Sequence, residues 1–169
     1  MEKSLSENIL NVCQILNKHS VQYMIVGGTA VALHGYFRRS MNVSGELTDK
    51  PDLDFWFNST YQNYFKLLNA LEELGQNVTE FKKEKAPDPK KSFFRYDFEK
   101  FNLDLLPKLK STLKFRDCFA RKDVVSLNKI DIPFIGYNDL IFDKEFNGRP
   151  KDLIDIVQLK KRRGGKEKE

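Results

Sequence analysis

A short stretch near the start of the chain has the residue types that bind phosphate. The apolar run from Tyr23 to Val26 ends in Gly27 and Gly28, and the run from Ala30 to Leu33 that follows favours a helix. A strand that stops at glycines and leads into a helix brings backbone amides close to phosphate oxygens, and the helix start favours negative charge. This stretch therefore predicts a phosphate-binding turn.

A pair of carboxylates follows on a second predicted strand, Asp52 to Phe57. Side chains two positions apart on a strand share a face, so Asp52 and Asp54 project together. Two carboxylates this close repel unless a cation lies between them, and Mg²⁺ is the hard, oxygen-seeking cation that suits them. Asp104, on a later predicted strand, supplies a third carboxylate. Three such groups could hold two Mg²⁺ ions that activate a hydroxyl and clamp a triphosphate for in-line displacement.

Each of these signals also has a plainer explanation. Acidic and apolar residues alternate on any half-exposed strand, and a glycine pair after a strand is common. Trp56 would share the face of Asp52 and Asp54, where a core or rim position is expected more than base stacking. His34 is expected to be packed and hydrogen-bonded and not a ligand. The order of the signals along the chain makes a joint site the better interpretation.

Composition describes a globular protein with one domain, residues 1–160, and a basic flexible tail, residues 161–169. The net charge is +5. From Lys160 onward six basic and two acidic residues give +4, so the rest of the chain carries only +1. A basic body that holds nucleic acid is therefore not indicated. The tail is expected to be solvated, with nucleic-acid contact as the alternative.

The sequence also indicates a cellular compartment. It has no apolar run long enough to cross a bilayer and no basic, apolar leader at its start, so no membrane association is expected. The two cysteines, Cys13 and Cys118, lack CxxC spacing and are expected to be buried, inert thiols. These features predict a cytoplasmic protein.

Hydrophobic periodicity predicts an α+β (two-layer α/β) fold: a mixed, mainly antiparallel sheet with helices packed on it and a C-terminal helical pair. The last helix is expected to turn Leu153, Ile156 and Val157 inward, and Asn138 to cap the one before it. The range 40–51 has loop character. Helices are expected at 4–18, 60–74, 111–120, 137–146 and 150–160, and strands at 78–81, 92–98, 101–106, 124–127 and 130–134, with hairpin turns at Glu99-Lys100 and Asn128-Lys129.

The motifs resemble a known family. The run GGTAVALHGY from Gly27, then Arg38 and DLDFW from Asp52, is similar to the nucleotidyltransferase superfamily that includes DNA polymerase beta. The resemblance is closest to small stand-alone bacterial members, including the nucleotidyltransferase toxins of abortive-infection toxin-antitoxin systems. The later run GRPKDLID from Gly148 resembles the helical end of these small proteins.

The resemblance implies roles for single residues. Asp52 and Asp54 would hold both metals, and Asp104 would be the third carboxylate and candidate general base. Lys144 and Arg149 match basic positions that contact the nucleotide or the acidic site. For Arg149, a helix-end ion pair with Asp152 or Asp155 is an equal alternative. The residues implied to bind the β- and γ-phosphates of an NTP are Gly27, Gly28 and Thr29.

One departure from the family pattern concerns spacing. The family places its first metal aspartate near position 42, whereas here it comes at Asp52, about ten residues later by register. Asn42 and Ser44 occupy the uninserted positions and cannot replace metal carboxylates. Either the intervening segment carries Asp52 and Asp54 back to the expected place, or the site is altered.

Two functions follow, from different classes. The first is Mg²⁺-dependent transfer of an NMP from an NTP to an acceptor hydroxyl on RNA, a protein or a small molecule. The second is a catalytically silent nucleotidyltransferase-like module that binds nucleic acid or a partner protein in a two-gene, toxin-antitoxin type system. The three aspartates favour the enzyme.

Overall fold

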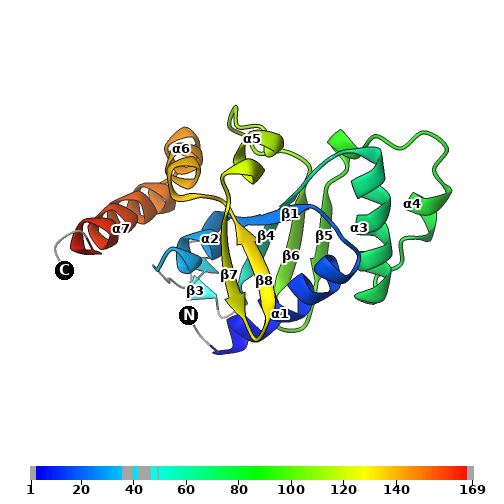
Figure 1. The fold of residues 1–169 in the computed structure, drawn as a ribbon, viewed down its shortest axis with the longest axis horizontal. Coiled ribbons are helices and arrows are strands. Elements are labelled where there is room, and N and C mark those ends of the chain that lie inside the picture. Colours follow the sequence, from blue (N-terminus) through cyan, green and yellow to red (C-terminus); the bar gives the residue numbers. More distant parts are fainter. Residues whose placement is uncertain (1–2, 36–39, 42–46, 49, 167–169) are drawn as a thin grey trace.

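The computed structural model describes residues 3–35, 40–41, 47–48 and 50–166 (Figure 1). Helices and strands are mixed along the chain. The elements in order are α1 (Lys3–Lys18), β1 (Tyr23–Val26), α2 (Gly27–Leu33), β2 (Ser40–Met41), β3 (Leu47–Thr48), β4 (Asp52–Phe57), α3 (Tyr61–Glu73), α4 (Thr79–Lys83), the short 3-10 helix η1 (Pro89–Lys91), β5 (Phe94–Asp97), β6 (Asn102–Leu106), α5 (Phe115–Ala120), β7 (Asp123–Leu127), β8 (Ile130–Phe134), α6 (Tyr137–Asn147) and α7 (Pro150–Lys166).

A six-stranded mixed sheet forms the centre, in the order β5-β6-β4-β1-β8-β7. The pairs β1–β4, β5–β6 and β7–β8 are antiparallel, and β4–β6 and β1–β8 are parallel. The α+β prediction with a mainly antiparallel sheet is confirmed. The hairpin turn at Asn128-Lys129 is also confirmed, and both of its residues have positive φ, as a tight two-residue hairpin requires.

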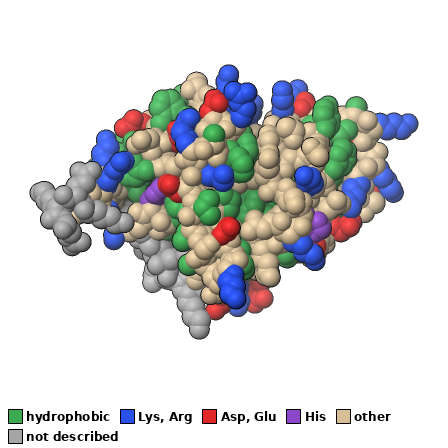
Figure 2. All heavy atoms as spheres, in the orientation of Figure 1, with side chains coloured by type: hydrophobic (Ala, Val, Ile, Leu, Met, Phe, Trp, Pro, Cys, Tyr) green, Lys and Arg blue, Asp and Glu red, His purple; other side chains and the backbone are tan. Residues whose placement is uncertain are grey.

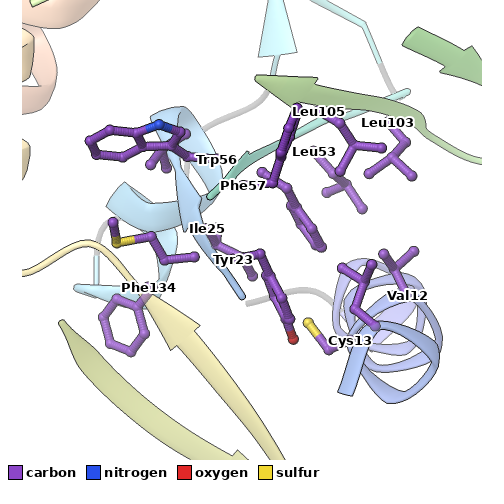
Figure 3. Close-up of a cluster of buried hydrophobic side chains, with 14 of the residues drawn as sticks. Val12, Cys13, Tyr23, Ile25, Leu53, Trp56, Phe57, Leu103, Leu105 and Phe134 are labelled. Carbon is purple, nitrogen blue, oxygen red and sulfur yellow. The ribbon is translucent and has the colours of Figure 1, made fainter. Parts of the chain in front are cut away.

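The two faces of the sheet differ in character. Leu53 and Phe57 of β4 lie with Leu103 and Leu105 of β6 on the side that α1 covers, where Val12 is also buried (Figure 3). Alternate positions of β4 point to the other face. This other face begins with Asp52 and Asp54 and ends with Trp56, whose ring meets Phe115 of α5 edge to face with centroids 5.4 Å apart.

Burial of the sheet face that α1 covers contributes much of the stability of the domain. Its apolar side chains are almost completely removed from water, which stabilises the fold by about 1.5–3 kcal/mol for each large side chain. Cys13 and Cys118 are buried free thiols, as predicted. Burial raises the pKa of each thiol to about 12, so neither is a reactive thiolate at neutral pH.

The C-terminal helical pair is also confirmed. Gly148 ends α6 with φ +60°, and Pro150 begins α7, as the sequence predicts. In Figure 1 the pair lies at the opposite end of the molecule from α3 and α4. Gly136, and not Asn138, precedes the first turn of α6, so the predicted cap is wrong.

Two predicted segments have different structures. Of the strand expected at 78–81, residues 79–81 lie in helix α4 and Val78 precedes it. Val78 is buried, and Lys82 pairs with Glu72 of α3 at 3.1 Å. The segment packs as a helix beside α3 instead of extending the sheet. The loop expected at 40–51 contains the antiparallel pair β2–β3.

The last helix differs from its prediction in rotation and in length. Leu153 and Val157 were expected to face inward but are 53% and 50% exposed, while Ile156 is buried as expected. Asp152 and Asp155 take the inner positions instead, because they pair with the buried Lys144. The helix continues past residue 160 to Lys166. Of the segment expected to be a tail, residues 167–169 lie outside the described residues.

Candidate functional site

The three aspartates lie side by side on neighbouring strands. Strands β4 and β6 pair in parallel, with Asp54 opposite Asp104 and Asp52 opposite Asn102. Paired residues of adjacent strands project to the same face of a sheet. The amide of Asn102 donates to Asp52 Oδ1 at 2.8 Å, which fixes that carboxylate at the rim. The structure therefore brings together the carboxylates that the sequence places about fifty residues apart, and we call Asp52, Asp54 and Asp104 the carboxylate cluster.

The glycine turn meets the carboxylate cluster directly. Strand β1 runs antiparallel to β4 with Val26 opposite Asp54, so the next residue, Gly27, lies against the Asp54 side chain. A Cβ at Gly27 would lie 2.4 Å from Asp54 Oδ2, and the φ of Gly27 is +65°. Only glycine fits this position without a shift of its neighbours. The segment between the two halves therefore carries Asp52 and Asp54 back to the turn, and Asn42 and Ser44 lie outside the described residues.

Thr29 supports the same junction from within. Its hydroxyl donates to the backbone oxygen of Asp52 at 3.3 Å, and its side chain is buried. This bond ties the first turn of α2 to the start of β4. The side chain of Thr29 is thus engaged with the protein, while Gly27 and Gly28 are both partly exposed.

Electrostatic repulsion within the carboxylate cluster is strong at Asp54. Burial, together with the charges of Asp104 and Asp52, raises the pKa of Asp54 to about 7, although Lys144 and Lys151 oppose the shift. Burial also raises the pKa of Asp104, and Arg95 opposes that shift. Carboxyl groups with raised pKa values are typical of sites that bind a cation or transfer a proton.

Arg95 is the site residue that the sequence argument missed. It lies on β5 opposite Asp104, donates to Asp104 Oδ2 at 3.1 Å and lies 3.7 Å from Asp52 Oδ1. The predicted hairpin already contained this information, because a two-residue turn at Glu99-Lys100 pairs position 95 with position 104. Three adjacent strands, β5, β6 and β4, thus contribute Arg95, Asp104 and Asp54 to one row of polar groups.

The basic residues of α6 and α7 lie on a second layer. Lys144 Nζ is buried and lies 3.1 Å from both Asp152 Oδ1 and Asp155 Oδ2. Arg149 Nε donates to Asp152 Oδ2 at 2.7 Å. The helix-end ion pair considered for Arg149 is therefore present, and its partner is Asp152. We call Lys144, Arg149, Asp152 and Asp155 the buried ion-pair network.

The two layers are within electrostatic reach of each other. Lys144 and Lys151 lower the pKa of Asp54, and Asp54 in turn helps to raise the pKa of Arg149. The sequence gives no signal that Lys151 belongs to the site, because a lysine in the first turn of a helix is usually a surface residue. Basic groups at the corner between α6 and α7 therefore act electrostatically on the carboxylate cluster.

Two aromatic predictions are settled by packing. His34 Nε2 donates to the backbone oxygen of Ile135 at 2.8 Å, and its ring packs edge to face on Phe134 and Tyr137. This is the packed, hydrogen-bonded histidine that the sequence predicts. Trp56 is 1% exposed, so it is a core residue and base stacking on it is excluded in this conformation.

The donor set of the carboxylate cluster fits Mg²⁺, although its side chains are not gathered around one point. In the described part of the chain, no three His, Cys, Asp or Glu side chains form a group that could hold a metal ion in this conformation. One observation supports the fit. Asp104 Oδ1 and Asn102 Oδ1 are buried without a hydrogen-bond partner among the described residues, and hard oxygen donors are what Mg²⁺ prefers.

Two solved structures are similar to the chain over most of its length. The crystal structure of an antigenic nucleotidyltransferase-like protein from Paracoccidioides brasiliensis covers 92% of this chain and 74% of its own, with a TM-score of 0.51 and 14% identity. The lincomycin-bound crystal structure of the lincosamide antibiotic adenylyltransferase LnuA covers 95% of this chain and 96% of its own, with a TM-score of 0.51 and 16% identity. The chain has the nucleotidyltransferase fold.

This comparison confirms the superfamily resemblance at the level of the fold, and the low identities carry it no further. No protein-family model matches the sequence, and no curated protein matches it. Within the described residues of this nucleotidyltransferase fold, no helix has both the length and the apolar character needed to cross a bilayer.

Proposed function

We propose that this protein is an Mg²⁺-dependent nucleotidyltransferase. An acceptor hydroxyl forms a bond to the α-phosphorus of an NTP, the bond from that phosphorus to the bridging oxygen breaks, and pyrophosphate leaves. The observation that supports this proposal most is the alignment of Asp52, Asp54 and Asp104 on β4 and β6, directly beside Gly27. The glycine turn and the three carboxylates are thereby adjacent on a nucleotidyltransferase fold.

Each acidic residue has a distinct position in this proposal. Asp52, Asp54 and Asp104 would hold two Mg²⁺ ions, which supply charge neutralisation for the triphosphate and lower the pKa of the attacking hydroxyl. Asp104 is also the candidate general base, because Oδ1 has no hydrogen-bond partner within the described chain and can accept the acceptor's proton. Asp104 is only 8% exposed, so burial restricts the positions that its carboxylate can adopt.

The phosphates of the NTP would lie between the glycine turn and the α6–α7 corner. Gly27 and Gly28 have no side chain to keep a phosphate oxygen away from the backbone amides. Lys144, Arg149 and Lys151 supply positive potential from the opposite side, as their electrostatic coupling to Asp54 supports. Arg149 is half exposed, so its guanidinium can contact phosphate while it remains paired with Asp152.

The experiment is a transfer assay with α-labelled NTPs, with cellular RNA, protein extract and hydroxylated small molecules as acceptors. LnuA acts on lincosamide antibiotics, which supports including small molecules in the panel. The double variant Asp52→Asn/Asp54→Asn is expected to abolish transfer while it keeps the circular-dichroism spectrum. A matched control, Asp88→Asn/Asp131→Asn, changes two exposed aspartates away from the site. Full activity in the first double variant would refute the metal assignment.

A silent binding module is the second candidate, and a specific observation favours it. Arg95 occupies the neighbourhood of two of the three carboxylates, and the described acidic residues do not converge on one point. Calorimetry with an NTP and Mg²⁺ separates the two functions. An enzyme binds the NTP more tightly with Mg²⁺ than with EDTA, whereas a silent module binds a nucleic acid or partner protein without that dependence.

A further inference from the structure

Arg95 is a cation built into the carboxylate cluster. Its position is fixed by the backbone, because β5 pairs with β6 and places Arg95 opposite Asp104. Its guanidinium spans two of the three acids, with Nη1 3.1 Å from Asp104 Oδ2 and Nη2 3.7 Å from Asp52 Oδ1. A guanidinium stays charged at every physiological pH, so this positive charge is permanent.

The cluster needs such a charge when no metal is present. When all three aspartates are ionised, they and the one arginine sum to −2, and carboxylates on adjacent strands destabilise each other. Arg95 touches Asp104 through one oxygen only. The other oxygen, Oδ1, is buried without a hydrogen-bond partner among the residues that the structure describes. Arg95 thus compensates the cluster incompletely.

Arg95 is also free to withdraw. It lies on β5, the first strand of the sheet order, and its side chain is 51% exposed, whereas that of Asp104 is 12% exposed. A long, half-exposed side chain on an edge strand can rotate into solvent without moving the backbone. The acidic side of the pair is held in place, and the basic side is the movable one.

We propose that Arg95 is a positioning residue that acts as the internal counter-cation of the carboxylate cluster. It orders Asp52 and Asp104 in the metal-free protein and must release them before a divalent cation binds, so metal affinity is set by competition with this ion pair. The inference rests on the proposed function, because it takes the carboxylate cluster as the metal site. Arg95 thereby lowers the affinity of the cluster for metal, and it orders Asp52 and Asp104 when no metal is bound.

The test measures Mn²⁺ binding by electron paramagnetic resonance and calorimetry, without nucleotide. Arg95→Gln removes the competing charge and is expected to bind Mn²⁺ about 2- to 5-fold more tightly than the wild-type protein, the size expected for one partly exposed ion pair. Arg95→Lys keeps the charge and is expected to remain near the wild-type affinity. Arg116→Gln is the matched control, because Arg116 is almost fully exposed on α5 and the change in net charge is the same.

A second readout follows thermal unfolding with EDTA and with Mg²⁺. Arg95→Gln is expected to unfold at a lower temperature than wild type in EDTA, and to gain more from Mg²⁺. Unchanged or weaker Mn²⁺ binding in Arg95→Gln, with normal binding in wild type, overturns this inference and leaves the proposed function intact. Absence of Mn²⁺ binding in both proteins overturns the inference and the proposed metal site together. Binding by Arg95→Gln alone supports the competition in its strongest form.

Discussion

Two clusters of charged residues lie on adjoining layers of this molecule, and they differ in how completely they are paired. In the buried ion-pair network, two acids and two bases neutralise each other, and Lys144, Asp152 and Asp155 are nearly inaccessible to water. In the carboxylate cluster, three acids face one base. Asp52 and Arg95 are about half exposed, and one Asp104 oxygen has no partner in the described chain.

The pKa values show the same contrast. Burial acts to raise the pKa of Asp152, yet hydrogen bonds from Arg149 and Lys144 lower it below its ordinary value. At Asp54 burial and two neighbouring carboxylates act in the same direction, and its pKa rises to about 7. The buried ion-pair network stabilises the packing of α6 on α7. The carboxylate cluster is left short of positive charge, and this shortage is the physical ground on which we propose it as a cation site.

Removal of Lys144 should have the largest effect on stability. Lys144→Met leaves Asp152 and Asp155 buried with one partner fewer, and should lower the free energy of unfolding by about 3–5 kcal/mol. Urea denaturation at neutral pH measures it. Lys160→Met is the control, because Lys160 pairs with Glu145 at the surface, and should cost less than about 1 kcal/mol. Equal costs for the two variants would remove the distinction between buried and exposed pairs.

The pH dependence of stability should be intermediate in size and should come from the carboxylate cluster. The folded-state pKa of Asp54 is about 7 and its unfolded value is near 4, so the folded state retains a proton that the unfolded state loses. The favourable contribution is complete below pH 4 and is lost as the pH rises to about 7.

This effect is measured in EDTA by comparing wild type with Asp54→Asn. The variant cannot ionise at this position, so it should become more stable than wild type by roughly 2 to 4 kcal/mol as the pH rises from 4 to 8. Parallel stability curves for the two proteins over that range would show that ionisation of Asp54 does not destabilise the folded protein.

The smallest expected effect concerns the glycine that borders the carboxylate cluster. Gly27→Ala places a Cβ against Asp54 Oδ2 at a residue with positive φ, and should cost about 1–3 kcal/mol. Gly75→Ala is the matched control, because Gly75 has φ +93° but no described atom within 4 Å of a Cβ. The excess cost in Gly27→Ala, measured by thermal unfolding, isolates the contact with Asp54 from backbone strain.

Much of the fold and part of the site follow from local sequence. The alternation in Asp52 to Phe57 predicts both the strand and the shared face of its aspartates, and the structure has both. The hairpin turn at Glu99-Lys100 predicts the pairing that brings Arg95 opposite Asp104. In each case the deciding interactions lie within a few residues along the chain or across one tight turn.

Other features depend on partners that are far apart in sequence. Hydrophobicity predicts that Leu153, Ile156 and Val157 form the inward face of α7, but only Ile156 is buried. Asp152 and Asp155 lie on that face because they pair with the buried Lys144 of α6. The apolar side chains that remain on α7, Leu153 and Val157, are exposed, and so are Phe142 and Phe146 of α6. Figure 2 shows hydrophobic side chains among Lys and Arg at the surface. Periodicity alone cannot choose between two faces that both carry candidates for burial.

The sequence by itself determined the six strands of the main sheet, the shared face of Asp52 and Asp54, and the candidate residues for phosphate and metal, because these depend on side-chain alternation and glycine freedom. Only the tertiary structure decided whether the glycine turn and the aspartates meet. Their meeting depends on the antiparallel pairing of β1 with β4, which joins Val26 to Asp54 across the intervening residues. That pairing is a long-range contact whose register is set by the packing of both strands on one core, and no local pattern encodes it.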